Sequence, residues 1–597
     1  MPSATQSDRA ATLLSEVRRR GIRIWNVGSE IHHAGPEGVL GVDLRDCLVD
    51  AKADLLDLLL AEHATEERGH PLTRTQQRFQ VIRGGGTNPG DHIRLIHRLR
   101  GPVDFAALES AFLELVIQQP SLRTSFIAHE GDLVQRVVAP WRFRIRRRSM
   151  IDATSDEVNA ESQRFIGESF DLASGNLLRA IAIELGDDSH LLVIIGHHLV
   201  VDGWSTSVLL EELGRLYAIA ADGRFREREP ENARFGDHAR AMLDWEGSER
   251  CREEIGRWQA EIAPGTTASA LPTDEDRDRD RLVEFDAVRG VLEGLLVSRL
   301  GERARKWRTG SMQILQAVLS CLVARAAGQD LAITGLALTN RTRTEHERMI
   351  GNFANESIVR VEVDPGDDFT SVLARVDEAV RRSTERIDTA FEQVVEAVGL
   401  QRIGRRRLAV PIFFSFQDRR RGGSLAFTDV SVELVPDHHL NTFQEIGLRV
   451  IEEADSMQIR IEYDRTLYTP QRIESFLANL VAMLECVLED PRTSLADLPF
   501  DASLAEGITV VSGTPRSGSQ EHVEPASMIE TRLAELWTDL LGVHPVGRFD
   551  DFFDLGGSSL LAVRLIDRVH EIFGTSLGLE ALVSSPTLHE LAGRIER

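Results

Sequence analysis

The stretch that decides the fold runs from residue 190 to residue 205 and reads HLLVIIGHHLVVDGWS. Its first part, Leu191 to Ile195, is apolar and partly β-branched, and it is short enough for a buried strand. A polar turn with His197, His198 and Asp202 follows. A buried strand that ends in such a turn places ionisable groups at the edge of a core, which costs free energy unless a partner or a chemical task compensates.

Two interpretations of this turn stay open from local chemistry alone. Imidazole titrates near neutral pH, so His198 could accept and return a proton during catalysis. Alternatively, the two histidines and Asp202 form a hydrogen-bonded structural turn, because buried polar groups are usually satisfied by partners and do no chemistry. The spacing between His198 and Asp202 does not require contact between imidazole and carboxylate, and Asp202 could anchor an arginine elsewhere in the chain.

Length and composition predict a multidomain protein. At 597 residues the chain exceeds what one hydrophobic core usually supports. The net charge of −25 argues against nucleic acid as the main partner. Apolar runs are too short to cross a bilayer, a signal-peptide core is missing, and the four cysteines have no metal-ligand spacing. We therefore expect no membrane segment, no bound metal and a cytoplasmic location.

The N-terminal 63 residues predict a small unit of their own. We expect disorder in residues 1–8, and a compact domain over residues 9–63 with a helix, a hairpin that turns at Gly28 and Ser29, and a second helical run. So small a core is marginal, which favours a partner or oligomerisation. The order of elements, with the phrases RGIRIW and ADLLDLLL, resembles the docking domains of the tubulysin type. That resemblance implies a hairpin that receives the C-terminal tail of an upstream polyketide or nonribosomal peptide synthetase, and pairing of two copies. A simple N-terminal cap on the next domain is the alternative.

Residues 70–500 form the main body and carry the motifs of one family. The pattern HHxxxDG of residues 197–203, followed by Trp204 and Ser205, resembles the active-site signature of condensation domains from nonribosomal peptide synthetases. Other stretches resemble further motifs of that family, and they span residues 72–76, 121–126, 339–341, 350–353 and 411–417. The sequence departs from the family at Gln118, Gln119 and Pro120, where Arg-His-Glu is usual. The resemblance implies two chloramphenicol-acetyltransferase-like α/β lobes with the active site between them.

The resemblance also assigns roles to five residues. His198 would position and deprotonate an attacking amine or stabilise the charge that develops during attack. His197 would orient the turn, and Gly203 would leave space for the substrate. Asp202 would pair with Arg341, which is a structural task.

The C-terminal part predicts a linker and a carrier domain. Residues 501–527 are rich in Gly, Ser, Thr, Pro and charged residues, which is typical of a linker. Residues 528–597 have helical periodicity and contain the phrase DFFDLGGSSL at residues 551–560. The serine at the end of this phrase could simply cap a helix. The phrase also resembles the attachment site of peptidyl carrier proteins, which implies a four-helix domain with covalent 4′-phosphopantetheine on Ser559, added by a phosphopantetheinyl transferase.

Together these features predict a docking–condensation–carrier protein that is multidomain, α/β in its first parts and all-α at its end. The linker leaves no room for an adenylation domain. We therefore expect amide formation between an upstream acyl or peptidyl thioester and an aminoacyl thioester loaded in trans by a separate adenylation enzyme. Two alternatives stay open: an epimerisation-type domain of the same superfamily, and a catalytically silent scaffold that docks the carrier.

Overall fold

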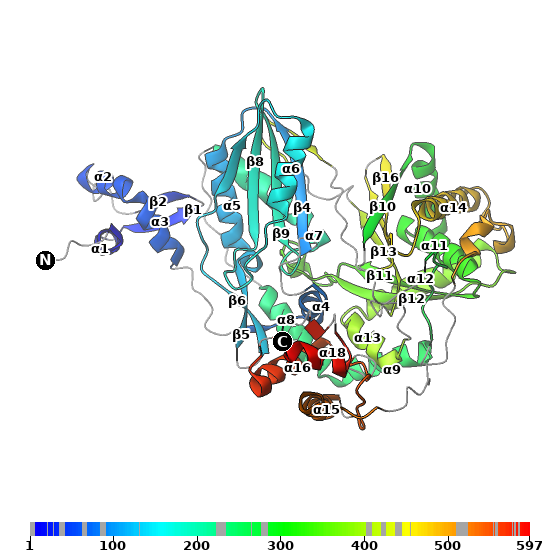
Figure 1. The fold of residues 1–597 in the computed structure, drawn as a ribbon. Coiled ribbons are helices and arrows are strands. Elements are labelled where there is room, and N and C mark those ends of the chain that lie inside the picture. The colour runs from blue at the N-terminus through cyan, green and yellow to red at the C-terminus, as the bar shows by residue number, and fades with distance from the viewer. Residues whose placement is uncertain are drawn as a thin grey trace.

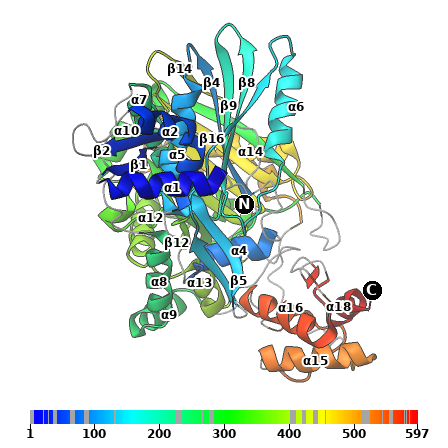
Figure 2. The same cartoon turned by 90° about the vertical axis from the view of Figure 1, so that its left-hand side faces the viewer.

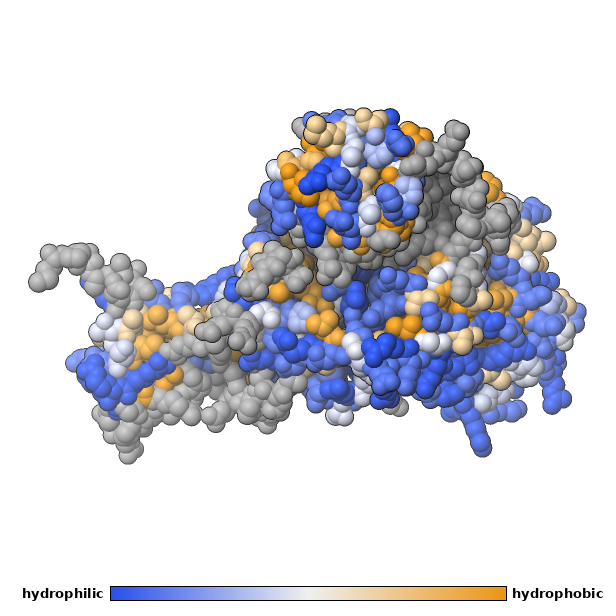
Figure 3. Space-filling view, turned by 90° about the horizontal axis from the view of Figure 1, so that it is seen from below, coloured by the Kyte–Doolittle hydropathy of each residue, from blue (hydrophilic) through white to orange (hydrophobic). Residues whose placement is uncertain are grey.

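Two α/β lobes lie side by side, a small unit lies on the outer side of the first lobe, and a helical C-terminal domain lies below them (Figure 1). Figure 2, turned by 90°, also has the C-terminal helices below the lobes. Figure 3, viewed from below, shows the C-terminal domain projecting from the body. This computed structural model describes residues 6–596 apart from gaps, of which the longest are residues 35–41, 62–68, 84–90, 223–233, 276–283, 401–408, 419–424, 436–443 and 509–522.

The first lobe is built on a five-stranded sheet with the strand order β14-β4-β9-β8-β7, and a smaller sheet has the order β3-β6-β5. Its elements are β3 (His70–Pro71), α4 (Arg74–Arg83), β4 (His92–Arg100), α5 (Phe105–Gln118), β5 (Thr124–His129), β6 (Asp132–Val137), β7 (Ile145–Ser149), α6 (Ser155–Ile166), β8 (Leu178–Gly186), β9 (Ser189–His197) and α7 (Gly203–Ala221). The strands β4, β9 and β8 pair antiparallel, while β7 runs parallel to β8.

β9 is the central strand of the larger sheet, which explains why the stretch at residues 190–205 organises the lobe. The strand is buried from Leu191 to His197, because β4 and β8 flank it on both sides. Leu108 of α5 and Leu209 of α7 join the same hydrophobic core, and the two helices pack against each other. The predicted buried strand over residues 191–195 is confirmed.

The second lobe holds a six-stranded sheet with the order β10-β16-β15-β13-β11-β12. Its elements are β10 (Phe285–Glu293), α10 (Leu295–Trp307), α11 (Ser311–Ala327), β11 (Leu331–Leu338), β12 (Asn355–Glu362), α12 (Phe369–Glu385), α13 (Phe391–Val398), β13 (Ile412–Asp418), β15 (Ile446–Glu452), β16 (Ser456–Asp464) and α14 (Pro470–Glu489). Among the described helices, none alone is long and apolar enough to cross a membrane. The helices α10 and α11 reach that length only as a pair bent by 99°, and α11 is buried in the core of the lobe.

One strand from the part of the sequence that forms the second lobe belongs to the sheet of the first lobe. β14 (Ser431–Leu434) follows β13 in sequence, but it pairs with β4 at the edge of the first lobe's sheet. Leu425 and Val430 lie just before β14 in the sequence, and both belong to the core of the first lobe. Helices α8 (Phe235–Glu246) and α9 (Glu249–Glu261) lie between α7 and the second lobe in sequence, and α9 packs on α13. The two-lobed α/β fold expected from the resemblance is confirmed.

The N-terminal unit contains α1 (Gln6–Arg19), the hairpin β1 (Arg23–Val27) and β2 (Glu30–Ala34), and the helices α2 (Val42–Asp50) and α3 (Lys52–Ala61). The predicted hairpin is present, with the turn where expected. The expectation of disorder for residues 1–8 is wrong for residues 6–8, because α1 begins at Gln6 and extends the amphipathic helix backwards. Residues 1–5 lie outside the described residues.

This unit is not separate from the first lobe. Leu56 and Leu60 of α3 are buried in the core of that lobe, whereas Leu55 and Leu59 face the core of the N-terminal unit. The backbone N–H of Ser29 also donates to the hydroxyl of Ser110 on α5 at 3.1 Å. One helix therefore contributes two adjacent faces, about 100° apart around its axis, to two cores, which the sequence of α3 allows because leucines occupy both.

The C-terminal domain contains α15 (Met528–Leu541), α16 (Ser559–Phe573) and α18 (Leu588–Ile595) in its described part. The predicted linker over residues 501–527 is too long at its start. Leu504 is buried in the core of the second lobe, and Ile508 forms a β-bridge with Thr273. Composition alone missed this, because a single apolar side chain is enough to attach a short segment. Residues 509–522 lie outside the described residues.

Candidate active site

Two histidines lie at the edge of the core of the first lobe, His197 as the last residue of β9 and His198 as the first residue of the turn that follows. His197 is buried, and its Nδ1 accepts a hydrogen bond from the N–H of Leu199 at 3.1 Å. His198 is half-buried, and its backbone N–H donates to the carbonyl of Asp91 at 2.8 Å. The ring of His197 is thus held by the backbone of the turn itself, while His198 lies at the border between core and surface.

Asp202 closes the turn and begins α7. Its carboxylate caps the helix by accepting from the N–H of Ser205 at 2.7 Å. It also accepts from the N–H of Phe353 at 3.0 Å and from Nη2 of Arg341 at 3.1 Å. Both members of this ion pair are almost wholly buried, with side-chain exposures of 1% and 2%. The pair that the resemblance implies is therefore present, and it joins the two lobes.

Arg341 has further partners in its own lobe and in the first. Its guanidinium donates to the hydroxyl of Ser205 at 2.8 Å, to the carbonyl of Met349 at 2.7 Å and to the carbonyl of His346. It also lies 4.3 Å from the ring centre of Phe353. Burial lowers the pKa of Arg341, and Asp202 opposes that shift. Arg341 is therefore hydrogen-bonded to residues of both lobes and stabilises the contact between them.

Residues 341–353 form a segment that we call the interlobe strap, because it leaves β11 in the second lobe and lies against the first. Gln119 donates to the carbonyl of Arg348 at 3.1 Å and accepts from the N–H of Ile350 at 2.9 Å. Trp204 donates from Nε1 to the carbonyl of Glu347 at 2.9 Å. Gln119 thus pairs with the strap as another backbone segment would, at a position where the sequence departs from the family.

His92 is a neighbour of the turn that sequence reasoning missed. It lies opposite His197 in the β4–β9 pair, and its ring is 6.2 Å from that of His197 and 5.0 Å from that of Phe170. Its Nδ1 lies 2.8 Å from the carbonyl oxygen of Ile166. Burial lowers the pKa of His92 to about 4, and the contact with Ile166 only partly opposes this. The ring is therefore neutral near pH 7, and only the pairing of β4 with β9 could have revealed it.

Gly203 marks a close approach of the two lobes. A Cβ atom on Gly203 would lie 3.0 Å from Nε2 of Gln417, at the end of β13. A larger residue at position 203 would therefore displace the glutamine of the other lobe. The site thus combines a turn from the first lobe with Gln417 and Arg341 from the second.

Two buried histidines pack against Phe353, the residue whose ring also contacts Arg341. His238 of α8 and His346 of the strap have ring centres 5.1 Å apart, and both pack against Phe353. Burial lowers the pKa of His238 to about 3, and the neighbouring His346 adds to the shift. Burial also lowers the pKa of His346. Two neutral rings therefore fill the space between α8 and the strap.

The C-terminal domain meets the first lobe at α4. Helix α16 lies against α4, and Figure 1 shows the two close together below the sheet of the first lobe. Ser559 is the first residue of α16. Residues 556–558 lie outside the described residues. Because the N-terminus of a helix favours negative charge, a serine at this point suits the attachment of a phosphate group.

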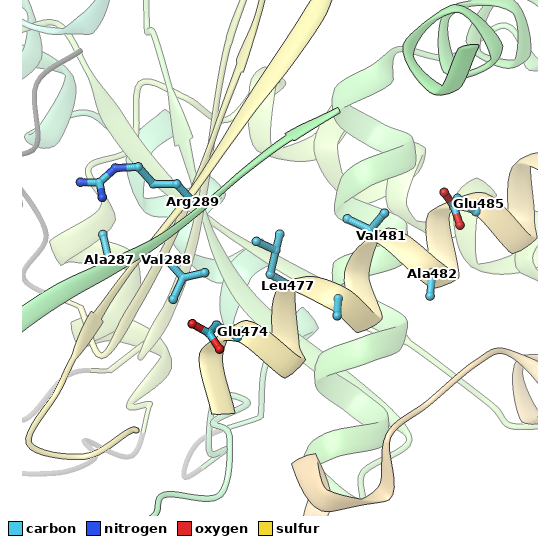
Figure 4. A pocket seen from close by; sticks show the side chains of 9 residues that line it. Ala287, Val288, Arg289, Glu474, Leu477, Val481, Ala482 and Glu485 are labelled. Atoms are coloured by element: carbon cyan, nitrogen blue, oxygen red, sulfur yellow. The ribbon is translucent and has the colours of Figure 1, made fainter. Parts of the chain in front are cut away.

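A surface groove of about 670 Å³ lies in the second lobe between β10 and α14 (Figure 4). Its lining includes Val288 of β10 and Leu477 and Val481 of α14. β10 is the edge strand of the sheet, and the lining comes only from β10 and α14, so the groove is separate from the histidine turn. Among the described residues, no group of three or more His, Cys, Asp or Glu side chains is arranged to hold a metal ion.

The fold and the turn define a two-lobed α/β protein with a histidine turn between its lobes and a helical carrier-type domain at its end. The sequence matches the family described as "Condensation domain" over residues 67–502, and the family described as "Phosphopantetheine attachment site" over residues 531–595. The chain belongs to the condensation-domain family, and its C-terminal domain is a phosphopantetheine attachment domain.

Individual relatives agree with this assignment. Malpinin synthetase from Mortierella alpina is 26% identical over 430 residues, which cover 71% of this chain and 6% of the synthetase. Cyclosporin synthetase simA from Tolypocladium inflatum is 28% identical over 441 residues, which cover 72% of this chain and 3% of the synthetase. The chain thus spans less than a tenth of the length of these two relatives.

Solved structures show the same fold. The X-domain in the "Complex of the X-domain and OxyB from Teicoplanin Biosynthesis" has a TM-score of 0.64 at 25% identity, covering 73% of this chain and 98% of that one. The four-domain nonribosomal peptide synthetase AB3403 has a TM-score of 0.62 at 16% identity, covering 80% of this chain and 37% of that one. The second likeness supports the fold alone.

Proposed function

We propose that this protein forms an amide bond between an acyl or peptidyl thioester on an upstream carrier and an aminoacyl thioester on its own carrier domain. One observation carries the proposal: a condensation-family body with the HHxxxDG turn on its central strand is followed in the same chain by a phosphopantetheine attachment domain. The contact of α16 with α4 supports transfer in cis, because it brings the carrier domain to the lobe that holds the turn.

Ser559 is our candidate for the residue that a phosphopantetheinyl transferase modifies. The support is its register in the LGGSSL phrase and its place at the start of α16. When bound, 4′-phosphopantetheine supplies the thiol that holds the acceptor as a thioester. The serine contributes the hydroxyl oxygen, and the start of the helix favours the phosphate charge.

In the proposed step, the acceptor amine attacks the carbonyl carbon of the donor thioester. A C–N bond forms, the C–S bond breaks, the donor thiol leaves, and the amine loses one proton. His198 positions the amine and takes this proton, or stabilises the charge that develops at the carbonyl. His197 keeps the turn in shape through Leu199, and Gly203 leaves space beside Gln417. Holding both thioesters in one site supplies much of the rate by proximity.

Asp202 and Arg341 act as structural support in this proposal. Their ion pair is buried and connects the end of the turn to the interlobe strap. Loss of either side chain would therefore disturb the position of the turn and the angle between the lobes. The chemistry itself does not require their charges.

Two further partners follow from the domain order. We propose that the N-terminal unit receives the C-terminal tail of an upstream synthetase, since β1 pairs only with β2 within the described residues and a strand edge can accept an extended peptide. The resemblance of this unit also supports a homodimer. We further propose loading by a separate adenylation enzyme, because the segment between the two matched domains is too short for one.

A second candidate function is a silent scaffold that binds partner proteins. The likeness to an X-domain seen in a complex with OxyB favours it. The HHxxxDG turn with its buried Asp202–Arg341 pair favours the enzyme. An epimerisation-type domain is the weaker alternative, because Trp204 and Ser205 follow the motif and the carrier follows the condensation domain.

The test is intact-mass measurement of the full chain. The chain is incubated with a phosphopantetheinyl transferase, candidate adenylation enzymes with amino acids and ATP, and an acyl-loaded carrier. We expect a first mass gain for the prosthetic arm, a second for the amino acid and a third for the donor acyl group. Loading without the third gain, across matched donors, would support the scaffold and contradict the enzyme.

A further inference from the structure

Helix α4 connects several parts of the molecule through its side chains. Arg78 forms ion pairs with Glu356 at 2.6 Å and Glu392 at 3.2 Å in the second lobe, and burial limits the access of water to them. The hydroxyl of Thr75 donates to the carbonyl of Ala354 at 3.2 Å. These contacts fix α4 relative to the second lobe, although it belongs to the first.

One side chain of α4 reaches the histidine turn. Gln76 is fully buried, and its Nε2 donates to the carbonyl of Leu199 at 3.0 Å. Leu199 is the residue directly after His198. The same Nε2 donates to Oε1 of Gln135 at 3.1 Å, while the Oε1 of Gln76 accepts from the N–H of Thr73 at 3.0 Å. Both amide N–H groups and the oxygen of Gln76 are thus engaged.

Among the hydrogen bonds described for His198 to Val200, those other than the bond from Gln76 are made within the turn or with Asp91, the residue before β4. The N–H of Val200 donates to the carbonyl of His197 at 3.0 Å, and that of His198 donates to the carbonyl of Asp91. The bond from Gln76 differs, because it comes from a helix that is anchored to the second lobe. It therefore relates the position of the turn to the part of the protein that faces it.

We propose that Gln76 is a positioning residue for the proposed condensation, acting on His198 through the carbonyl of Leu199. This inference rests on the proposed function. Gln76 fixes the position of the turn, so that the imidazole of His198 lies within reach of the acceptor amine. Gln76 itself touches no substrate. A displacement of about 1 Å in such a site can lower the rate by roughly 100-fold, so one buried amide is enough to matter.

The main variant is Gln76→Leu, which keeps the approximate size of the side chain and removes all its hydrogen bonds. We expect kcat to fall on the order of 10- to 100-fold, with KM for the donor carrier unchanged and Ser559 still modified. The matched control is Gln77→Leu on the same helix, because the Gln77 side chain bonds only the carbonyl of Leu72 among the bonds described for it. The control should keep the kcat of the unsubstituted protein.

A second variant, Gln76→Glu, gives a readout that a merely structural role would not produce. Burial raises the pKa of the introduced carboxyl. Its protonated form can donate to the carbonyl of Leu199, whereas its ionised form cannot. Relative to the unsubstituted protein at each pH, kcat of this variant should recover as the pH falls.

Hydrogen exchange of the peptide covering residues 196–202 separates this inference from the proposed function. We expect faster exchange in Gln76→Leu than in Gln77→Leu, whether or not the protein makes an amide. Absence of condensation by the unsubstituted protein contradicts only the proposed function. Unchanged kcat together with unchanged exchange in Gln76→Leu overturns the positioning role. Loss of the folded state in both Gln76 variants overturns it as well, because Gln76 would then serve folding.

Discussion

At the scale of the single residue, the assignment of Ser559 depends on one register. Ser558 and Ser559 are adjacent in the LGGSSL phrase, and α16 begins at Ser559. We predict that Ser559→Ala fails to gain the mass of the phosphopantetheine arm. Ser558→Ala, its matched control, should gain it in full. A mass gain in Ser559→Ala would show that the register is wrong.

The proposed catalytic role of the turn depends on a single residue, His198. We predict that His198→Ala lowers the rate of amide formation about 10²- to 10⁴-fold, which is the range for a general acid–base group. Modification of Ser559 should not change, because the carrier domain folds around its own core. The measurement is single-turnover kinetics with both carriers loaded. A rate close to that of the unsubstituted protein would leave substrate positioning by other groups as the mechanism.

Asp202 belongs to the same scale but acts on stability. Removing one partner of a buried ion pair typically costs about 3–5 kcal/mol. We expect Asp202→Ala to lie near the lower end, because Arg341 keeps its bonds to Ser205 and to two carbonyls. Thermal and denaturant unfolding would measure this. The exposed Asp152 supplies the control, since Asp152→Ala should leave stability unchanged. Equal stabilities of the two variants would contradict the structural role of Asp202.

At the scale of the element, α3 is shared between two cores. We predict that Leu56→Ala lowers the free energy of unfolding by about 2–5 kcal/mol, as for other buried leucines. The substitution should lower the denaturant midpoint of unfolding of the first lobe, because Leu56 is part of the core of that lobe. Ala53→Ser on the exposed side of α3 is the control. A shift confined to a separate N-terminal transition would show that the unit folds on its own. Deletion of residues 1–63 is therefore not a clean test of the docking proposal, because it would also remove Leu56 and Leu60 from the core of the first lobe.

At the scale of the whole molecule, buried neutral histidines predict sensitivity to acid. His92 and His238 have pKa values lowered to about 4 and about 3, whereas unfolded histidine titrates near pH 6.5. Between these values the unfolded chain binds more protons than the folded one. The contribution of the two neutral histidines to the free energy of unfolding is therefore complete above pH 6.5 and is lost as the pH falls toward 4. Melting temperatures measured from pH 7 to pH 4 should decrease, and His92→Gln should reduce the slope. An unchanged slope would contradict the buried neutral state of His92.

Several features followed from the sequence alone, because they depend on local pattern. The strand at residues 191–195 is apolar and short, and the hairpin around Ser29 alternates in character, so both were predictable. The motif HHxxxDG and the phrase DFFDLGGSSL carried the family, which the comparisons confirmed. Arg341 was expected as the partner of Asp202 only through the resemblance, since 139 residues separate them.

Tertiary structure alone decided which distant groups surround the turn. His92 reaches it through the pairing of β4 with β9, Gln417 through the approach of β13, and Gln76 through the packing of α4. Gln76 and Gln417 lie in stretches that resemble family motifs, at residues 72–76 and 411–417, but their contact with the turn has no local signal. The same holds for His92, because an amide or imidazole has the same appearance in a sequence whether it is buried or solvated. The attachment of Leu56 and Leu504 to neighbouring cores has the same origin. A hydrophobic pattern fixes which face of an element is buried, and only the folded chain determines what that face meets.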